Sequence, residues 1–216
     1  MGWGRYGVCD SCWQEAAADP GLLRTTGAVS VGTPWAFDSV AAWGRYEGRL
    51  RELVQSLKYD GRFRLARPLG EFLSEAFVAS GLATRAQDGV LAAVPLSPRR
   101  EARRGYNQSR LLAREMARVL RRSGGPKLRE VSALVKTIDT PPQAERSRAE
   151  RLKGPADAYG LRPGAAKRIN GRTVVLVDDV LTTGATAGEC ARILKAGGAV
   201  RVVVVVVAKT MGGNSG

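Results

Sequence analysis

Histidine is absent from this chain of 216 residues, and cysteine is scarce, with three residues. Without histidine, the protein cannot form a Ser-His-Asp triad, a Cys-His pair or a histidine-ligated metal site. Long apolar runs are also missing, because the longest, Val202 to Ala208, is far too short to cross a bilayer, and the first residues lack the apolar core of a signal peptide. We therefore expect a cytoplasmic protein that does not insert into a membrane.

Positive charge, by contrast, is abundant. The chain carries 34 Lys and Arg residues against 20 acidic residues, a formal net charge of +14. Such a surplus favours phosphate-rich partners, which include a nucleotide-like substrate, nucleic acid and an anionic surface, although part of it simply solvates the protein. The length and hydrophobic content suit one main domain with a sizeable core and a small appendage.

The most informative stretch is 173–186, which reads TVVLVDDVLTTGAT. The apolar run Val174 to Val177 shows no alternation and predicts a strand buried on both faces of a parallel sheet. Two carboxylates, Asp178 and Asp179, are expected to end this strand. A small, hydroxyl-rich turn, Thr182 to Thr186, then opens onto a helix predicted over 187–196. The order of strand, acidic pair and turn predicts a binding site.

The residue types in this stretch point to a phosphorylated sugar. Backbone N–H groups near Gly184, threonine hydroxyls and a helix N-terminus suit a phosphate. Ionised carboxylates only accept hydrogen bonds, so they need a ligand with donors or a metal ion. A ribose 5-phosphate satisfies both requirements, because its hydroxyls can donate to Asp178 and Asp179. Two other interpretations of the stretch are weaker. A Walker B strand also combines apolar residues with acids, but its partner motif, G-x-x-x-x-G-K-[ST], does not occur in this sequence. An acidic cap on the following helix would explain one aspartate but not the pair.

This motif resembles the loop with which type I phosphoribosyltransferases bind 5-phosphoribosyl 1-diphosphate (PRPP).

The rest of the chain predicts further alternating strands and helices. The expected elements are a strand or hairpin over 35–46, helices over 50–59 and 65–77, a strand over 89–94, a helix ending near 122, and strands over 131–138 and 200–208. An arginine-rich loop follows the strand over 89–94, at a second strand end where a ligand could bind. A polar, Pro-rich segment at about 139–154 is predicted to be a lid, and 211–216 a disordered tail.

A C-x-x-C motif at Cys9 and Cys12 is half of a zinc-ribbon site or a redox pair. A closed Zn²⁺ site needs four ligands, and the remaining cysteine, Cys190, lies in the helix predicted after the phosphate turn. Two reduced surface thiols are the alternative to Zn²⁺.

Several segments together resemble the ComF (competence protein F) family of phosphoribosyltransferase-fold proteins. They are Leu57-Lys58-Tyr59, Val94 to Arg100, Arg104 to Ser109, Thr140 to Gln143, Ser147 to Arg151, and the PRPP loop. The resemblance implies an α/β fold, with a type I phosphoribosyltransferase-like parallel sheet flanked by helices over 34–210. It also implies that 1–33, with its single C-x-x-C, is a small remnant of an N-terminal zinc-ribbon module.

The same resemblance implies roles for individual residues. Asp178 and Asp179 would be the catalytic pair that holds the ribose diol and, through PRPP, Mg²⁺. The 5-phosphate would lie on Thr182, Thr183, Gly184, Ala185 and Thr186, and the diphosphate on Leu96, Ser97, Arg99 and Arg100. Further contacts from the flap and to phosphates would come from Lys58, Arg104, Tyr106, Gln143 and Arg148. The reaction would displace diphosphate at C1 through an oxocarbenium-like state.

The leading hypothesis is a PRPP-binding protein linked to DNA uptake in natural transformation, with the uptake machinery as a partner. A non-enzymatic accessory that binds single-stranded DNA is one alternative, motivated by the net charge of +14 and an arginine stripe over 99–122. A PRPP-sensing regulator is another. The fold by itself cannot choose among these functions, and the sequence names no acceptor for a transferase.

Overall fold

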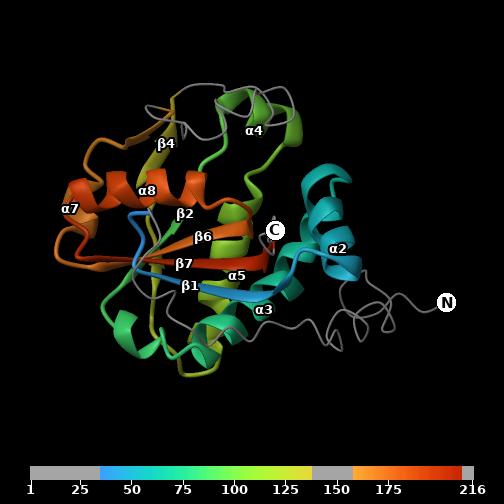
Figure 1. The fold of residues 1–216 in the computed structure, drawn as a ribbon, viewed down its shortest axis with the longest axis horizontal. Helices are drawn as coiled ribbons and strands as arrows, with labels where there is room; N and C mark the ends of the chain where they lie inside the picture. The colour runs from blue at the N-terminus through green and yellow to red at the C-terminus, as the bar shows by residue number, and fades with distance from the viewer. Residues whose placement is uncertain (1–34, 138–157, 211–216) are drawn as a thin grey trace, which may run out of the picture.

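A five-stranded, all-parallel sheet forms the centre of the computed structural model, which describes residues 35–137 and 158–210 (Figure 1). The strand order is β1-β7-β6-β2-β3. The strands are β1 Ser39–Arg45, β2 Val90–Ala93, β3 Arg129–Glu130, β6 Thr173–Leu181 and β7 Arg201–Lys209. A separate antiparallel ribbon joins β4 Leu134–Lys136 to β5 Tyr159–Leu161.

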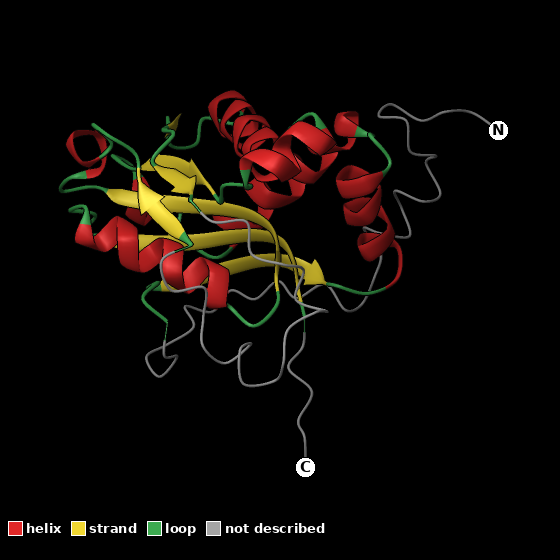
Figure 2. Ribbon diagram, turned by 90° about the horizontal axis from the view of Figure 1, so that it is seen from above, coloured by secondary structure: helices red, strands yellow, loops and turns green. Residues whose placement is uncertain are grey.

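Helices cover both faces of the sheet (Figure 2). They are α2 Gly48–Tyr59, α3 Ala66–Ala79, α4 Pro98–Arg104, α5 Gln108–Arg122, α7 Ala166–Ile169 and α8 Ala185–Ala196, with single 3-10 turns at Phe63–Leu65 and Thr84–Ala86. The predicted α/β architecture, a parallel sheet flanked by helices, is thereby confirmed.

The alternation of side chains along β6 divides the core into two layers. Val175 and Val177 pack with α3 and α5 on one face, whereas Val174 and Leu176 pack with α7 and α8 on the other. Because successive residues of a strand point to opposite faces, a strand buried on both sides must be apolar at every position. The same reasoning explains the unbroken valine run of β7.

The strand that carries the acidic pair is longer than the sequence predicted. Asp178 does not follow β6 but lies within it, paired with Val206 of β7, and the pairing continues to Leu181. On the other side of β6, the ladder with β2 ends where Ala93 meets Val177. In the described part of the chain, the end of β6 therefore has a ladder partner on one side, which leaves a step in the sheet at the two aspartates.

The prediction of one strand over 131–138 is confirmed in part, because β4 lies within this range, but the strand is shorter than predicted and lies outside the main sheet. β3 ends at Glu130, and Val131 N makes a last hydrogen bond to Leu91 O at 2.7 Å. A tight turn, in which Ala133 N donates to Val131 O at 2.8 Å, then directs the chain out of the sheet and into β4. The stretch over 35–46, expected as a strand or a hairpin, contains one strand, β1, which pairs parallel with β7.

Other predictions fall on residues that the structure does not describe. They concern the N-terminal segment 1–33 with Cys9 and Cys12, the lid with Gln143 and Arg148, and the tail 211–216. Among the described residues, no helix is both long enough and apolar enough to cross a membrane.

Candidate functional site

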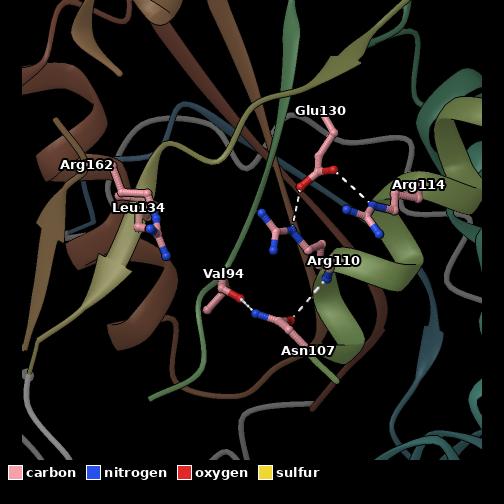
Figure 3. A network of polar contacts seen from close by, with 7 residues as sticks. All are labelled: Val94, Asn107, Arg110, Arg114, Glu130, Leu134 and Arg162. Atoms are coloured by element: carbon pink, nitrogen blue, oxygen red, sulfur yellow. Dashed lines mark hydrogen bonds and ion pairs between the residues drawn. The ribbon is translucent and has the colours of Figure 1, made fainter. Parts of the chain in front are cut away.

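The acidic pair lies beside the N-terminus of α5, at the step in the sheet. Asn107 caps this helix by accepting a hydrogen bond from Arg110 N, and its amide donates to Val94 O, both at 3.1 Å (Figure 3). The cap thus ties α5 to the end of β2 and brings Ser109 to the acids. Ser109 Oγ donates to Asp178 Oδ1 at 2.8 Å, and the same oxygen accepts from Asp179 N at 2.9 Å.

Asp179 has a different partner, which the sequence analysis missed. The Nζ atom of Lys58, in the last turn of α2, lies 2.8 Å from Asp179 Oδ1. The two side chains are 18% and 5% exposed. Lys58 was expected to contact a phosphate, yet in this structure it forms an ion pair with the acid. The second oxygen, Asp179 Oδ2, is buried and has no hydrogen-bond partner in residues 35–137 and 158–210.

The two neighbouring carboxylates perturb the ionisation of the site. Burial, and then the charge of Asp179, raise the pKa of Asp178 to about 7, while Lys58 and Ser109 act in the opposite direction. For Lys58, burial favours the neutral amine, but the carboxylates of Asp179 and Asp178 outweigh it and raise the pKa. Lys58 is therefore a lasting positive charge beside the acids.

The turn after β6 has the shape of an anion site. Gly184 has φ of +84° and immediately precedes α8, whose first residue is Ala185. Thr182 and Thr183 are exposed, and Thr183 Oγ1 accepts from Ala185 N at 3.4 Å. The exposed hydroxyls and the start of a helix of 12 residues thus lie together with the acidic pair at the end of β6.

Trp35, which the sequence analysis did not select, lies behind this turn. A Cβ atom on Gly184 would come within 2.7 Å of Trp35 Nε1, and one on Gly188 within 2.5 Å of Trp35 Cε3. Both positions therefore require glycine for close packing, and Gly184 also requires it for its backbone conformation. A tryptophan far away in the sequence supports the turn, so no local pattern could have identified it.

The predicted diphosphate loop is partly helical. Ser97 is buried and caps α4, accepting a hydrogen bond from Arg100 N at 3.4 Å, so Arg99 and Arg100 lie on that helix while Leu96 precedes it. This segment forms a helix because Ser97 is a favourable N-cap residue and Pro98 is a favourable first helical residue.

The remaining described residues of the predicted site hold neighbouring elements together. Arg104 bonds to Gln108 and lies 5.4 Å from the ring centroid of Tyr59. The hydroxyl of Tyr106 donates to Leu57 O, which connects the start of α5 to the last turn of α2. The structure thus brings Lys58, Arg104 and Tyr106 together, and it places Lys58 on the acidic pair.

A second group missed by the sequence analysis is a cross-strand pair in the ribbon of β4 and β5. Lys136 and Tyr159 are buried side by side, with Lys136 Nζ 5.2 Å from the ring centroid of Tyr159. Burial, and then the neighbouring Cys190, raise the pKa of Tyr159.

The donor set suits a divalent cation that arrives with a ligand. In the described part of the chain, no group of three or more Cys, Asp or Glu side chains is arranged to hold a metal. Two carboxylates are present, and within the described part of the chain Asp179 Oδ2 has no hydrogen-bond partner. Mg²⁺ is commonly bound by one or two carboxylates together with phosphate oxygens of the substrate, which fits Asp178 and Asp179.

Comparison with known proteins gives a consistent result. Residues 107–215 match the family model for the phosphoribosyl transferase domain. The chain is 30% identical to DNA utilization protein YhgH of Escherichia coli O6:H1, over 96% of this chain and 92% of that protein. It is 31% identical to competence protein F of Haemophilus influenzae, over 74% and 67%, and 27% identical to competence protein ComFC of Bacillus subtilis, over 88% and 66%.

Proposed function

Because this chain belongs to the ComF family and matches the phosphoribosyl transferase domain, we propose that it binds PRPP at the end of β6. The observation that supports this most directly is the meeting of three features at one strand end. They are a pair of aspartates, a turn with a left-handed glycine, and the N-terminus of α8. A phosphoribosyl group needs both hydroxyl acceptors and a phosphate cradle, and these features supply them.

Different residues of the site would contact different parts of PRPP. In our proposal, the 5-phosphate accepts hydrogen bonds from Thr182, Thr183 and the backbone around Gly184, and the ribose hydroxyls donate to the aspartates. The diphosphate lies toward Ser97, Arg99 and Arg100, whose guanidinium groups stabilise negative charge that develops on a leaving diphosphate. Bound Mg²⁺ would supply further neutralisation of the diphosphate charge. No protein base is required, which agrees with a chain that contains no histidine.

Calorimetry with PRPP and Mg²⁺ tests this proposal. The wild type should bind, and the double variant Asp178→Asn, Asp179→Asn should bind at least about 100-fold more weakly, since it loses two charged acceptors. Thermal unfolding of both proteins shows whether the variant is folded. Absence of binding by the wild type would refute the proposal. Release of diphosphate in the presence of candidate amine or base acceptors would then separate a transferase from a PRPP-sensing regulator.

The names of the relatives extend the proposal to a cellular process. They refer to DNA utilization and to competence. We accordingly propose that this protein acts in the cytoplasm on DNA taken up by the cell, in association with the uptake machinery. Deletion of the gene, with complementation by the wild type or by the double asparagine variant, would show whether transformation depends on the acidic pair.

Binding of single-stranded DNA is a second candidate function, favoured by an aromatic and basic surface beside the site. Tyr59 and Phe63 are 69% and 56% exposed, unusually so for large apolar side chains. Arg62 and Arg64 are exposed around them, and Arg104 lies over the ring of Tyr59. Exposed aromatics next to arginines can stack bases and hold phosphates.

Anisotropy titrations with labelled oligothymidylate at several salt concentrations test this candidate. Replacing both Tyr59 and Phe63 with alanine should weaken binding by at least about 10-fold, because base stacking is lost. Val78→Ala, at another exposed apolar residue, is the matched control. The double asparagine variant should bind the oligonucleotide like the wild type. Unchanged binding by the Tyr59, Phe63 double variant would exclude this surface.

A further inference from the structure

The ion pair between Lys58 and Asp179 joins two parts of the fold that approach the site from different directions. Asp179 lies on the central strand β6, whereas Lys58 lies on α2, at the end of the sheet toward which β6 and β7 point (Figure 1). The 2.8 Å contact is largely sheltered from solvent. A sheltered ion pair needs good geometry to offset the desolvation of both charges.

Neighbouring contacts hold Lys58 in this position. Its predecessor Leu57 is fully buried, and the carbonyl oxygen of Leu57 accepts the hydroxyl hydrogen bond of Tyr106. Its successor Tyr59 lies under the guanidinium of Arg104. The last turn of α2 is thus attached to α4 and α5 on both sides of Lys58, so the fold itself directs the ammonium to the acid.

The two carboxylate oxygens of Asp179 have different surroundings. Oδ1 is held by Lys58, whereas Oδ2 is buried and has no partner among the described residues. A neutral hydroxyl that reaches Oδ2 can donate to it while the ammonium stays in place. A free divalent cation would instead have to approach the same carboxylate a few ångströms from an existing positive charge, in a sheltered environment where repulsion is strong.

We propose that Lys58 is a specificity-determining residue that makes Asp179 accept sugar hydroxyls and reject free divalent cations. The identity of the hydroxyl ligand as a phosphorylated sugar rests on the proposed function. The rejection of free cations does not, since it follows from the ion pair. A cation would then enter only together with anionic oxygens of the ligand, which offset the charge of Lys58.

Binding of Mn²⁺ alone, measured by electron paramagnetic resonance on the full chain, tests the cation part. Lys58→Met should bind Mn²⁺ at least about 10-fold more tightly than the wild type, because the repelling charge is gone. Lys58→Arg keeps the charge and should behave like the wild type. Lys167→Met, an exposed residue of α7 at the other end of the sheet, is the control for loss of a lysine charge.

Two further variants keep the test decisive. Lys58→Gln retains a donor for Asp179 without the charge, so it should fold even if the methionine variant does not, and it should show the same gain in Mn²⁺ affinity. Adding Asp179→Asn to Lys58→Gln should abolish the gain. Equal Mn²⁺ affinity of wild type and folded Lys58→Gln would overturn the assignment.

Calorimetry with ribose 5-phosphate in the presence of EDTA tests the sugar part. The wild type should bind it without metal, and Lys58→Gln at least about 5-fold more weakly, because an anionic ligand then meets an uncompensated carboxylate. If no variant binds the sugar phosphate but the gain in Mn²⁺ affinity appears, cation rejection stands and PRPP binding falls. If the wild type binds the sugar phosphate and Mn²⁺ affinity never changes, PRPP binding stands and the role of Lys58 falls.

Discussion

The site has two walls that are built in opposite ways. One wall, which we propose holds the phosphate and call the phosphate wall, consists of consecutive residues, from Asp178 in β6 through the turn at Gly184 to the start of α8. The opposing wall consists of Lys58 from α2 together with Tyr106 and Ser109 from the segment that begins α5, and packing brings these two segments together. The comparison shows that local sequence can encode a cradle for a ligand, whereas the groups that tune its charge are supplied by distant elements.

The acidic pair, where the walls meet, illustrates the difference. Asp178 and Asp179 are adjacent in the sequence, but alternate side chains of a strand point to opposite faces. Asp178 accepts from Ser109, which lies in the first turn of α5 beside the end of β2, and Asp179 pairs with Lys58 of α2. Two identical residues thereby acquire different environments, and of the two only Asp179 retains a buried oxygen that lacks a partner in the part of the chain that the structure describes.

The largest effect on ligand binding should come from a substitution in the phosphate wall, at Gly184. In Gly184→Ala the new Cβ meets both a left-handed backbone and the indole of Trp35 at 2.7 Å. We expect PRPP binding to weaken about 30-fold, equivalent to about 2 kcal/mol. Calorimetry measures this. Gly164→Ala is the control, because Gly164 has φ of +74° but no atom within 4 Å of its Cβ position. Equal loss in both variants would mean that backbone strain alone matters and Trp35 does not.

A smaller effect should follow from removing Ser109 from the opposing wall. Ser109→Ala deprives Asp178 of a donor but leaves the hydrogen bond from Asp179 N, so we expect a loss of about 1 to 2 kcal/mol in the free energy of unfolding. Chemical denaturation measures it. Ser123→Ala, at the other end of the same helix and bonded to backbone carbonyls of its own helix, should cost less. Equal costs would argue against a special role for Ser109.

A still smaller effect should follow from Tyr106→Phe, which removes the hydroxyl that bonds to Leu57 O of α2 and leaves the ring in place. We expect a loss of about 1 kcal/mol in the free energy of unfolding. The sharper measurement is Mn²⁺ affinity, which should rise slightly as Lys58 becomes less firmly positioned. Tyr59→Phe, on an exposed ring, is the matched control. An increase in the control and none in Tyr106→Phe would contradict the anchoring of α2.

The smallest effect should come from a charge cluster outside both walls. Burial raises the pKa of Glu130, but hydrogen bonds from Arg110 at 2.8 Å and Arg114 at 3.0 Å outweigh it, so the pKa is lowered (Figure 3). A lowered carboxyl pKa contributes stability above the unfolded pKa, and that stability is lost as the pH falls through the folded pKa. We expect about 0.5 kcal/mol, since the arginines are solvent-screened.

Denaturation of wild type and Glu130→Gln between neutral pH and about pH 3 measures this contribution. The difference in unfolding free energy between the two proteins should be largest at neutral pH and should shrink below the ordinary pKa range of glutamate. PRPP binding should be unaffected at neutral pH. A difference that stays constant across this range would show that ionisation of Glu130 is not its cause.

Periodicity was sufficient to predict most of the fold. Unbroken apolar runs identified β6 and β7, because central parallel strands are buried on both faces, and the amphipathic patterns identified α2, α3 and α5. The strand predicted over 131–138 was too long, because β4 occupies only 134–136, outside the main sheet, and no periodicity records the turn at Ser132. The strand end at Val177 was misplaced because pairing with β7 continues to Leu181 irrespective of the two charges.

The sequence by itself determined the phosphate wall, since its chemistry depends on the order of neighbouring residues: two acids, a hydroxyl-rich turn with glycine, and a helix start. The tertiary structure alone decided that Lys58 pairs with Asp179, that Ser109 holds Asp178 and that Trp35 supports Gly184. These contacts join positions far apart in the chain, and the free energy that brings them together comes from burial of the core. No local pattern carries that information.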